Sequence, residues 1–422
     1  MFSRLKARAA KGILAAGVVV AMATLASCSS GQPATSAPGA SGAGKVTVWH
    51  YFSAPNQVAL MDNYKSQFEA ANPGSTVENV FVPYDQMNSK LVAATGAGTG
   101  PDIAVFNGAE YGTLASAGVL LPMDDYLGTF ADKSQLPDSV VHKLNDKTYA
   151  LQGYVNLLGL WYNKDILTEL GVQPPTTLDE LEAAMAMAKE KGYVGMTLSG
   201  LPQGQGEWQA YPWLSAKGFD YAAPDAAKLA DGLSLVRGWV DKGYVPQEAV
   251  TWDQTVPFQK FAAGKVAFAE NGNWQVGTAK SDAKFAYGVV PLPLGVTGKV
   301  YLGGEGQGIG ANSKSPDLAW KYLTATYLSK EGQLAAAEMV GSIPSRMDLA
   351  TDATVTGDEL LKPFAEEVGK YGTNYPASNL DPTAVPQIQL TVGQAWSAVI
   401  GKQTDPAAAA DQAMAKLKGL IK

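Results

Sequence analysis

The stretch GTGPDIAVF at residues 98–106 predicts a buried β-strand over 101–106 and indicates the class of fold around it. That strand holds few polar residues, as expected of a strand covered on both faces. Upstream of it, residues 46–49 and 77–82 favour strands, whereas 59–71 and 84–95 carry apolar residues at helical spacing. The alternation of short strands and helices predicts an α/β fold with a parallel sheet.

The rest of the chain continues this mixture and is long enough for two domains. Thr177 and Glu180 form a capping-box pattern, which predicts a helix over 178–191. Residues 256–264 favour a helix, 266–268 a strand and 271–274 a turn, and two prolines make 287–293 extended. We expect the C-terminal part, 386–422, to form two helices separated near Gly401.

The N-terminus predicts export from the cell. A basic segment is followed by an apolar run, 12–26, that is too short to cross a bilayer, so 1–27 reads as a signal peptide. The next residue, Cys28, is the only cysteine, and its setting resembles the lipobox of bacterial lipoproteins, in which this thiol is acylated. The alternative is an ordinary signal peptide with an incidental cysteine. Residues 28–44 are otherwise small and uncharged, which predicts a flexible tether.

Composition excludes several classes of function. The chain is 46% hydrophobic and carries a net charge of -7, with no basic patch of the kind that nucleic acid needs. Its two histidines, His50 and His142, rule out a multi-histidine zinc site and argue against a Ser-His-Asp triad. The loop GGEGQG at 303–308 lacks the Gly-Lys-Ser/Thr ending of a phosphate loop.

A glycosidase also combines carboxylates with aromatic residues. No short motif in this chain pairs two carboxylates, so we expect a protein that is not an enzyme and that needs no cofactor or metal.

Five motifs appear in a fixed order: GTGPDI at 98–103, LWYNKD at 160–165, FAAGKVAF at 261–268 followed by NGNW at 271–274, YGVVPLP at 287–293 and GSIP at 341–344. Together they resemble the extracellular solute-binding proteins of the maltose-binding type, the sugar receptors of bacterial ABC importers. The resemblance covers 45–422. It implies an α/β fold of two lobes, 45–152 with 289–341 and 154–286 with 345–422, joined by three crossovers around a ligand cleft.

The same resemblance implies the partners. We expect a monomer that is lipid-anchored at the extracytoplasmic face of the cell membrane. It would bind a carbohydrate, deliver it to the transmembrane subunits of an ABC permease by hinge closure, and touch the membrane only through its anchor.

A sugar ring shows C–H bonds on its faces and hydroxyls around its rim, so its receptor needs aromatic faces and planar polar side chains. With 9 Trp and 18 Tyr, the chain is rich in aromatic rings. The resemblance implies that Trp274, after the Asn-Gly turn, stacks on the sugar. It suggests the same role for Trp208, Trp396 and Tyr51, with core packing as the alternative for each.

The polar candidates come from two sources. Asn107 and Glu110 follow the third predicted strand, at the carboxyl end where α/β ligand sites form. The resemblance adds Asn156 at the first crossover and Glu305 in a glycine-rich cleft loop, with a merely solvated side chain as the alternative for Glu305. Asp253, beside a tryptophan, is a further candidate. The maltose receptor has an acidic residue at the position of Asn156, so maltose itself is not supported as the ligand.

Non-sugar ligands compete with this interpretation, namely a peptide, a polyamine, an anion or a metal chelate. Anion receptors favour arginine, and only Arg237 and Arg346 lie beyond the signal peptide. A cationic ligand stays open because the chain is acidic and its aromatic rings could form a cage. Carbohydrate is the favoured class.

Overall fold

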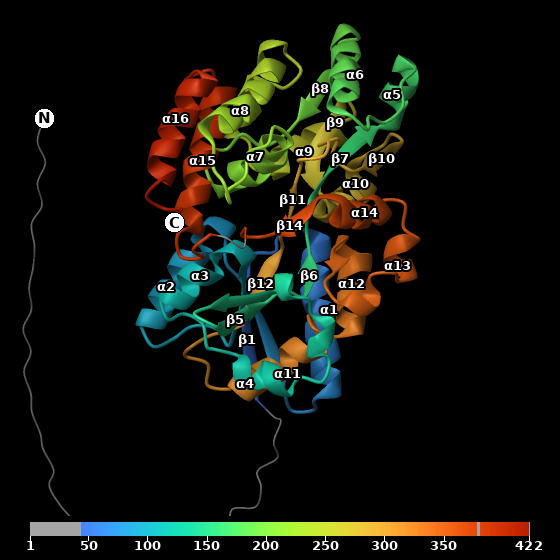
Figure 1. Ribbon diagram of the computed structural model, residues 1–422. Helices are drawn as coiled ribbons and strands as arrows, with labels where there is room; N and C mark the ends of the chain where they lie inside the picture. Colours follow the sequence, from blue (N-terminus) through green and yellow to red (C-terminus); the bar gives the residue numbers. More distant parts are fainter. Residues whose placement is uncertain (1–43, 378–379, 422) are drawn as a thin grey trace, which may run out of the picture. The chain divides into compact units, whose positions relative to one another are not determined.

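Two β-sheets organise the computed structural model, which describes residues 44–377 and 380–421 (Figure 1). These residues belong to one compact unit. The predicted signal peptide and Cys28 lie outside the described residues. Within the described ranges, no helix combines the length and the apolar character needed to cross a bilayer.

The first sheet has six strands in the order β2-β1-β3-β12-β5-β4. The strands are β1 (Lys45–His50), β2 (Thr76–Phe81), β3 (Ile103–Asn107), β4 (Val141–Leu144), β5 (Lys147–Leu151) and β12 (Glu305–Ile309). β1 pairs in parallel with β2 and β3, which confirms the predicted βαβ start of the chain. The expectation of a parallel sheet holds only there, because β12 enters from far along the sequence and runs antiparallel to both β3 and β5.

The second sheet has four strands in the order β10-β7-β9-β8. They are β7 (Leu158–Asn163), β8 (Val194–Thr197), β9 (Val266–Gly272) and β10 (Tyr287–Val290). β9 is buried along its whole length and continues beyond the predicted 266–268 as far as Gly272. Because β10 pairs with β7, residues 287–290 belong to this second sheet, whereas we expected the first lobe to resume at 289.

Six helices pack around the first sheet: α1 (Pro55–Ala71), α2 (Met87–Gly96), α3 (Tyr111–Ser116), α4 (Asp124–Thr129), α11 (Pro316–Ala325) and α12 (Lys330–Val340). α1 begins at Pro55, earlier than predicted, because proline is well suited to the first position of a helix. Its apolar face is buried against β2 and α12.

Most of the other helices pack around the second sheet or on one another beside it. They are α5 (Lys164–Leu170), α6 (Leu178–Glu190), α7 (Gly204–Ala216), α8 (Ala226–Asp241), α9 (Thr255–Ala262), α10 (Val276–Asp282), α13 (Ala353–Thr356), α14 (Leu361–Tyr371), α15 (Val385–Ile400) and α16 (Pro406–Leu417). The capping box of α6 is confirmed, since Thr177 Oγ1 accepts from Glu180 N at 3.2 Å. The two predicted C-terminal helices are confirmed as α15 and α16, which pack on α7 and α8.

Three segments connect the two sheets and are hydrogen-bonded to one another. β6 (Tyr154–Val155), in the first segment, pairs with β13 (Ile343–Pro344), in the third. Asn156 and Gly303, in the first and second segments, exchange two backbone hydrogen bonds of 2.9 Å. The second segment also contains β11 (Val300–Leu302), which pairs with β14 (Gly372–Asn374). The structure is therefore two-lobed with three crossovers, as the fold class predicts.

Candidate functional site

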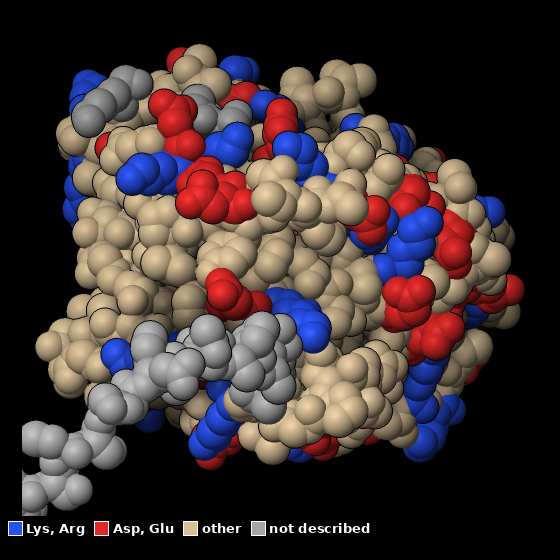
Figure 2. Space-filling view, turned by 90° about the horizontal axis from the view of Figure 1, so that it is seen from below, with Lys and Arg blue, Asp and Glu red and all other residues tan. Residues whose placement is uncertain are grey.

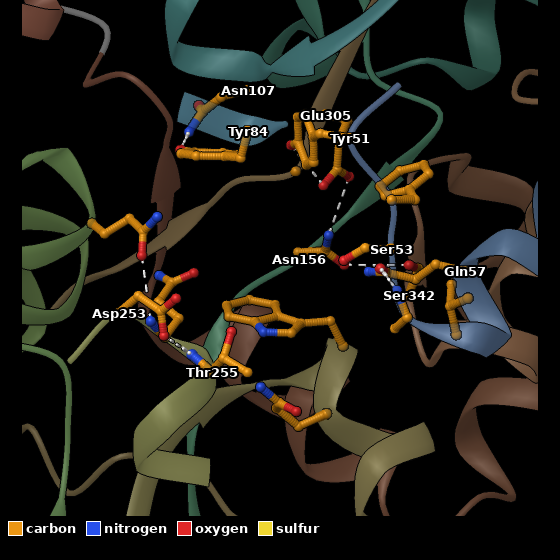
Figure 3. Close-up of a pocket in the computed structure, with 18 of the residues that line it drawn as sticks. Tyr51, Ser53, Gln57, Tyr84, Asn107, Asn156, Asp253, Thr255, Glu305 and Ser342 are labelled. Atoms are coloured by element: carbon orange, nitrogen blue, oxygen red, sulfur yellow. Dashed lines mark hydrogen bonds between the residues drawn. The ribbon is translucent and has the colours of Figure 1, made fainter. Parts of the chain in front are cut away.

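A cleft of about 1040 Å³ is lined by residues from both sheets and from the connecting segments (Figure 3). The first sheet contributes the residues that follow β1, β2 and β3. These three strands run in parallel, so their carboxyl ends meet at one edge, where α/β proteins place their ligands. All but one of the ligand-binding residues expected from the sequence line this cleft: Tyr51, Asn107, Glu110, Asn156, Trp208, Asp253, Trp274 and Glu305.

Trp274 stands on the second-sheet side of the cleft and is only partly buried. Its ring packs directly over Gly272 at the end of β9. A Cβ at Gly272 would lie 1.9 Å from Cζ3 of the indole, so no side chain can replace this glycine without displacing the ring. The Asn-Gly turn thus supplies the space in which the ring lies.

Trp208, on α7, is held more tightly and is 7% exposed. Its ring stacks on Tyr301 at 5.6 Å and meets Tyr375 edge-on at 4.6 Å. Gly303 leaves room for it, because a Cβ there would lie 2.1 Å from Cη2 of the indole. The indole N–H is buried and has no hydrogen-bond partner within the described chain.

A group of polar side chains lies on the first-sheet side (Figure 3). Tyr51 donates from its hydroxyl to Glu305 Oε1 at 3.0 Å, and Asn107 Nδ2 donates to the Tyr84 hydroxyl at 2.7 Å. The rings of Tyr51 and Tyr84 meet edge-on at 5.0 Å. Burial raises the pKa of the Glu305 carboxyl, against the opposing effect of the bond from Tyr51.

Asn156 joins the cleft to the connecting segments. Its Oδ1 accepts from Asn273 Nδ2 at 2.9 Å and from Ser342 Oγ at 3.3 Å, and its Nδ2 donates to Glu305 Oε2 at 3.3 Å. Asn273 also donates to the carbonyl of Gly341 at 2.8 Å. The side chain of Asn156 is therefore engaged where the connecting segments meet, so a ligand that contacts it also contacts these segments.

The two remaining acidic candidates differ in their surroundings. Asp253 Oδ1 accepts from the backbone N–H groups of Thr255 and Val256 at 2.8 and 3.2 Å, which caps the start of α9. Glu110, just after β3, has a pKa raised by burial and lowered in part by a hydrogen bond from Asn88. Both side chains line the cleft.

The structure does not bring Trp396 to the cleft. Trp396 is fully buried on α15, and its indole N–H donates to the carbonyl of Ser199 at 3.0 Å. The sequence spacing places an aromatic residue on a C-terminal helix, but it does not determine which face of that helix turns inward. Trp396 is a core residue of the second lobe.

Several cleft residues were not predicted from the sequence. They include Phe81 at the end of β2, which is 51% exposed, and Tyr84, Tyr375 and Gln389. The rule that selected Asn107 after β3 would also have selected Phe81 after β2, because the two strands end at the same edge. Nothing local in the sequence marks Tyr375 or Gln389, which reach the cleft through long-range packing.

The charged side chains that line the cleft are acidic. Its acidic lining residues are Asp85, Glu110, Asp253, Asp282 and Glu305, and no lysine or arginine is among the described residues that line it. On the face shown in Figure 2, acidic and basic side chains are interspersed. Among residues 44–377 and 380–421, no group of three or more His, Cys, Asp or Glu side chains is placed to hold a metal ion.

Known proteins are similar to this chain in sequence and in fold. The maltotriose-binding protein of Pyrococcus abyssi is 27% identical over 78% of this chain and 72% of its own length. The maltooligosaccharide ABC transporter solute-binding lipoprotein of Streptococcus pneumoniae is 24% identical over 79% of each chain. The solved GacH receptor of Streptomyces glaucescens superposes with a TM-score of 0.80 at 23% identity, covering 90% of this chain and 98% of its own.

The family model described as bacterial extracellular solute-binding protein matches residues 63–363, most of the chain. The chain belongs to the family of bacterial extracellular solute-binding proteins.

Proposed function

We propose that the chain is the substrate-binding component of an ABC importer and that it captures an uncharged carbohydrate, an oligosaccharide, in the cleft. The observation that carries the proposal is the lining of the cleft, which combines aromatic rings with amide and carboxylate groups and, among the described residues, includes no lysine or arginine. Rings of this kind can cover the C–H faces of a sugar, and the planar polar groups can bind its hydroxyls. Two relatives are named as binding maltotriose or maltooligosaccharides, which supports a carbohydrate ligand.

The acidic lining argues against charged sugars such as uronates and sugar phosphates. At an effective dielectric constant of about 50, a ligand anion about 6 Å from one carboxylate is repelled by about 1 kcal/mol. Because the lining holds several acidic side chains and no lysine or arginine among its described residues, this repulsion accumulates. An anionic ligand is therefore disfavoured relative to its neutral analogue.

Closure of the two lobes on the ligand would occur about the three connecting segments. The bonds that Asn156 makes to Ser342 and Asn273 support this site as the hinge. We propose lobes of 45–152 with 304–341 and 154–302 with 345–422, in which the second crossover lies at Gly303, because 291–302 still bond to the second lobe through Glu367, Ser215 and β14. The closed, loaded receptor would then dock on the permease, and it would change no bond of the ligand.

We also propose that Cys28 is acylated and holds the protein at the extracytoplasmic face of the cell membrane. The lipobox-like sequence supports this, and one relative is named as a lipoprotein. Labelling cells with a clickable fatty acid should mark the wild type and not Cys28→Ser. Equal labelling of both proteins would reject the anchor and leave the binding function untouched.

A thermal-shift screen tests the ligand class. The chain is heated with neutral oligosaccharides, with uronate-containing counterparts of equal length, with polyamines and with short peptides. A ligand that binds only the folded state raises Tm, because it adds about 2.7 kcal/mol to the free energy of unfolding when its concentration is 100 times its Kd. We expect a neutral oligosaccharide to raise Tm and its acidic counterpart to have a smaller effect.

A cationic solute is the second candidate, because the same acidic lining and aromatic rings could hold an amine. A Tm shift with polyamines and with no sugar would establish this alternative. A shift with peptides alone would reject both candidates.

A further inference from the structure

Glu207 is a fully buried acid on α7, one residue before Trp208. Its Oε1 accepts from the hydroxyls of Tyr221 and Tyr301 at 2.8 and 2.9 Å, and its Oε2 accepts from Gln389 Nε2 at 3.1 Å. In the part of the chain that the structure describes, none of the ion pairs involves Glu207. A buried carboxylate with neutral donors only is costly, so its retention calls for an explanation.

Two of the three donors of Glu207, Tyr221 and Tyr301, belong to a column of four aromatic rings that begins at the cleft. Trp208 stacks on Tyr301 at 5.6 Å, Tyr301 on Tyr211 at 4.2 Å, and Tyr211 on Tyr221 at 5.6 Å, with interplanar angles of 26°, 11° and 11°. Trp208 lines the cleft, and the second and fourth rings donate to Glu207. Because Glu207 fixes Tyr301, it also fixes the support of the Trp208 ring.

Gln389, on α15, is the third donor and lines the cleft itself. The bond to Glu207 uses its amide nitrogen and sets the orientation of its amide group. Its carbonyl oxygen lies beside Gly204, another lining residue, 3.6 Å from where a Cβ of Gly204 would be. Gln389 is thus oriented with an acceptor available for a sugar hydroxyl.

We propose that Glu207 is a positioning residue of the cleft, whose carboxylate holds the Trp208 ring and the Gln389 amide in the geometry that binds the ligand. Only the nature of the ligand rests on the proposed function. The cleft would then sense pH through a group that the ligand does not touch.

The direction of the pH dependence follows from the donors. A carboxylate can accept all three hydrogen bonds, whereas a protonated carboxyl group has an O–H of its own and must give up or reverse at least one of them. Burial raises the pKa of Glu207 to about 7, against the bonds from Tyr221, Tyr301 and Gln389. The competent arrangement is therefore populated above this pKa and lost below it.

The other titratable groups near Glu207 do not titrate in this range. The packed elements present Tyr211, Tyr221, Tyr301 and Tyr375, whose pKa values burial raises further above the ordinary tyrosine value. Asp220, next to Tyr221 in the sequence, forms an ion pair with Lys299 and has a lowered pKa. With a pKa of about 7, roughly one molecule in eleven is competent at pH 6, so Kd should be up to about tenfold weaker there than at pH 8.

The test compares the full chain with Glu207→Gln, using maltotriose and mannotriose as probes and calorimetric titrations at pH 6, 7 and 8. For the wild type we expect Kd to rise as the pH falls. Glu207→Gln should bind more weakly at pH 8 and show a smaller trend, because only the other cleft carboxyls, Glu110 and Glu305, then contribute to it. The matched control is Glu182→Gln, which removes a carboxylate that accepts from Trp239 and Lys242 outside the cleft and should keep the wild-type profile.

Two further measurements keep the proposal testable if Glu207→Gln does not fold or no probe binds. Tyr221→Phe removes one bond that lowers the pKa of Glu207, so the midpoint of the pH dependence should move upward. In the ligand-free protein, near-ultraviolet circular dichroism should report the ring column and change between pH 6 and 8 in the wild type and not in Glu207→Gln. An identical pH profile in the wild type, Glu207→Gln and Tyr221→Phe would overturn the proposal, whereas a failure of every sugar to bind would overturn only the proposed function.

Discussion

Replacing Gly272 by alanine should weaken ligand binding without removing any group that contacts the ligand. Gly272 has φ near -91°, an ordinary value, so alanine adds no backbone strain there. Its Cβ would lie 1.9 Å from Cζ3 of Trp274, and ordinary contact begins at 3.4 Å. The indole must therefore shift by the difference, 1.5 Å, out of the position in which it lies over the glycine.

The size of the effect follows from the area that the ring offers to a sugar. If a sugar face covers roughly 60 Å² of the indole, losing that contact costs about 1.5 kcal/mol at about 25 cal/mol per Å². This corresponds to an increase in Kd of roughly tenfold. The crowded methyl group should also lower the free energy of unfolding, by about 1 to 3 kcal/mol.

Titration calorimetry with the best ligand of the thermal-shift screen measures the first quantity, and urea unfolding measures the second. Gly238→Ala on α8 is the matched control, because a Cβ there meets nothing within 4 Å. It should leave Kd unchanged and raise stability by about 0.5 to 1 kcal/mol through helix propensity. If Gly272→Ala folds and binds as tightly as the wild type, Trp274 is not a platform for the ligand.

Three other substitutions probe the rest of the account. Trp396→Ala should lower the free energy of unfolding by about 3 to 5 kcal/mol and leave the Kd of the folded protein unchanged. An increase in Kd at unchanged stability would show that Trp396 contacts the ligand. Arg346 is buried and forms an ion pair with Asp348, which holds the pKa of that carboxyl below its usual range. The ion pair therefore stabilises the fold above the unfolded pKa of Asp348, and this stabilisation is lost as the pH falls towards the folded pKa. Arg346→Met should cost about 2 kcal/mol in urea unfolding at pH 7 and less in acid, and an equal cost at both pH values would reject the ion pair as the cause. Asn156→Ala removes the side-chain bonds to Asn273, Ser342 and Glu305. It should destabilise the fold by about 1 to 3 kcal/mol and raise Kd, so an unchanged Kd in calorimetry would show that the proposed hinge does not affect the site.

Much of the fold could be predicted from local sequence. The alternation of strands and helices up to residue 107 depends on periodicity and turn residues, and β1, β2 and β3 formed where expected. The antiparallel insertion of β12 could not be predicted in this way. Its pairing with β3 and β5 depends on contacts between segments far apart in the chain, which no local pattern encodes.

The same distinction explains which cleft residues were found. Asn107 follows a strand whose carboxyl end faces the cleft, and Trp274 follows a recognisable turn, so both carry a local signal. Gln389 and Trp396 lie on the same helix, α15, and sequence reasoning selected the wrong one. The packing of α15 on α7 turns Trp396 into the core and Gln389 towards Glu207, and that choice is made by tertiary contacts.

The most direct test of the central claim is a calorimetric titration of the wild-type chain at pH 7.5 with maltotriose, mannotriose and spermidine. The account predicts saturable binding of one neutral oligosaccharide per chain and no saturable heat with spermidine. Saturable binding of spermidine with none from any neutral sugar would contradict it, because the aromatic and acidic cleft would then be an amine site.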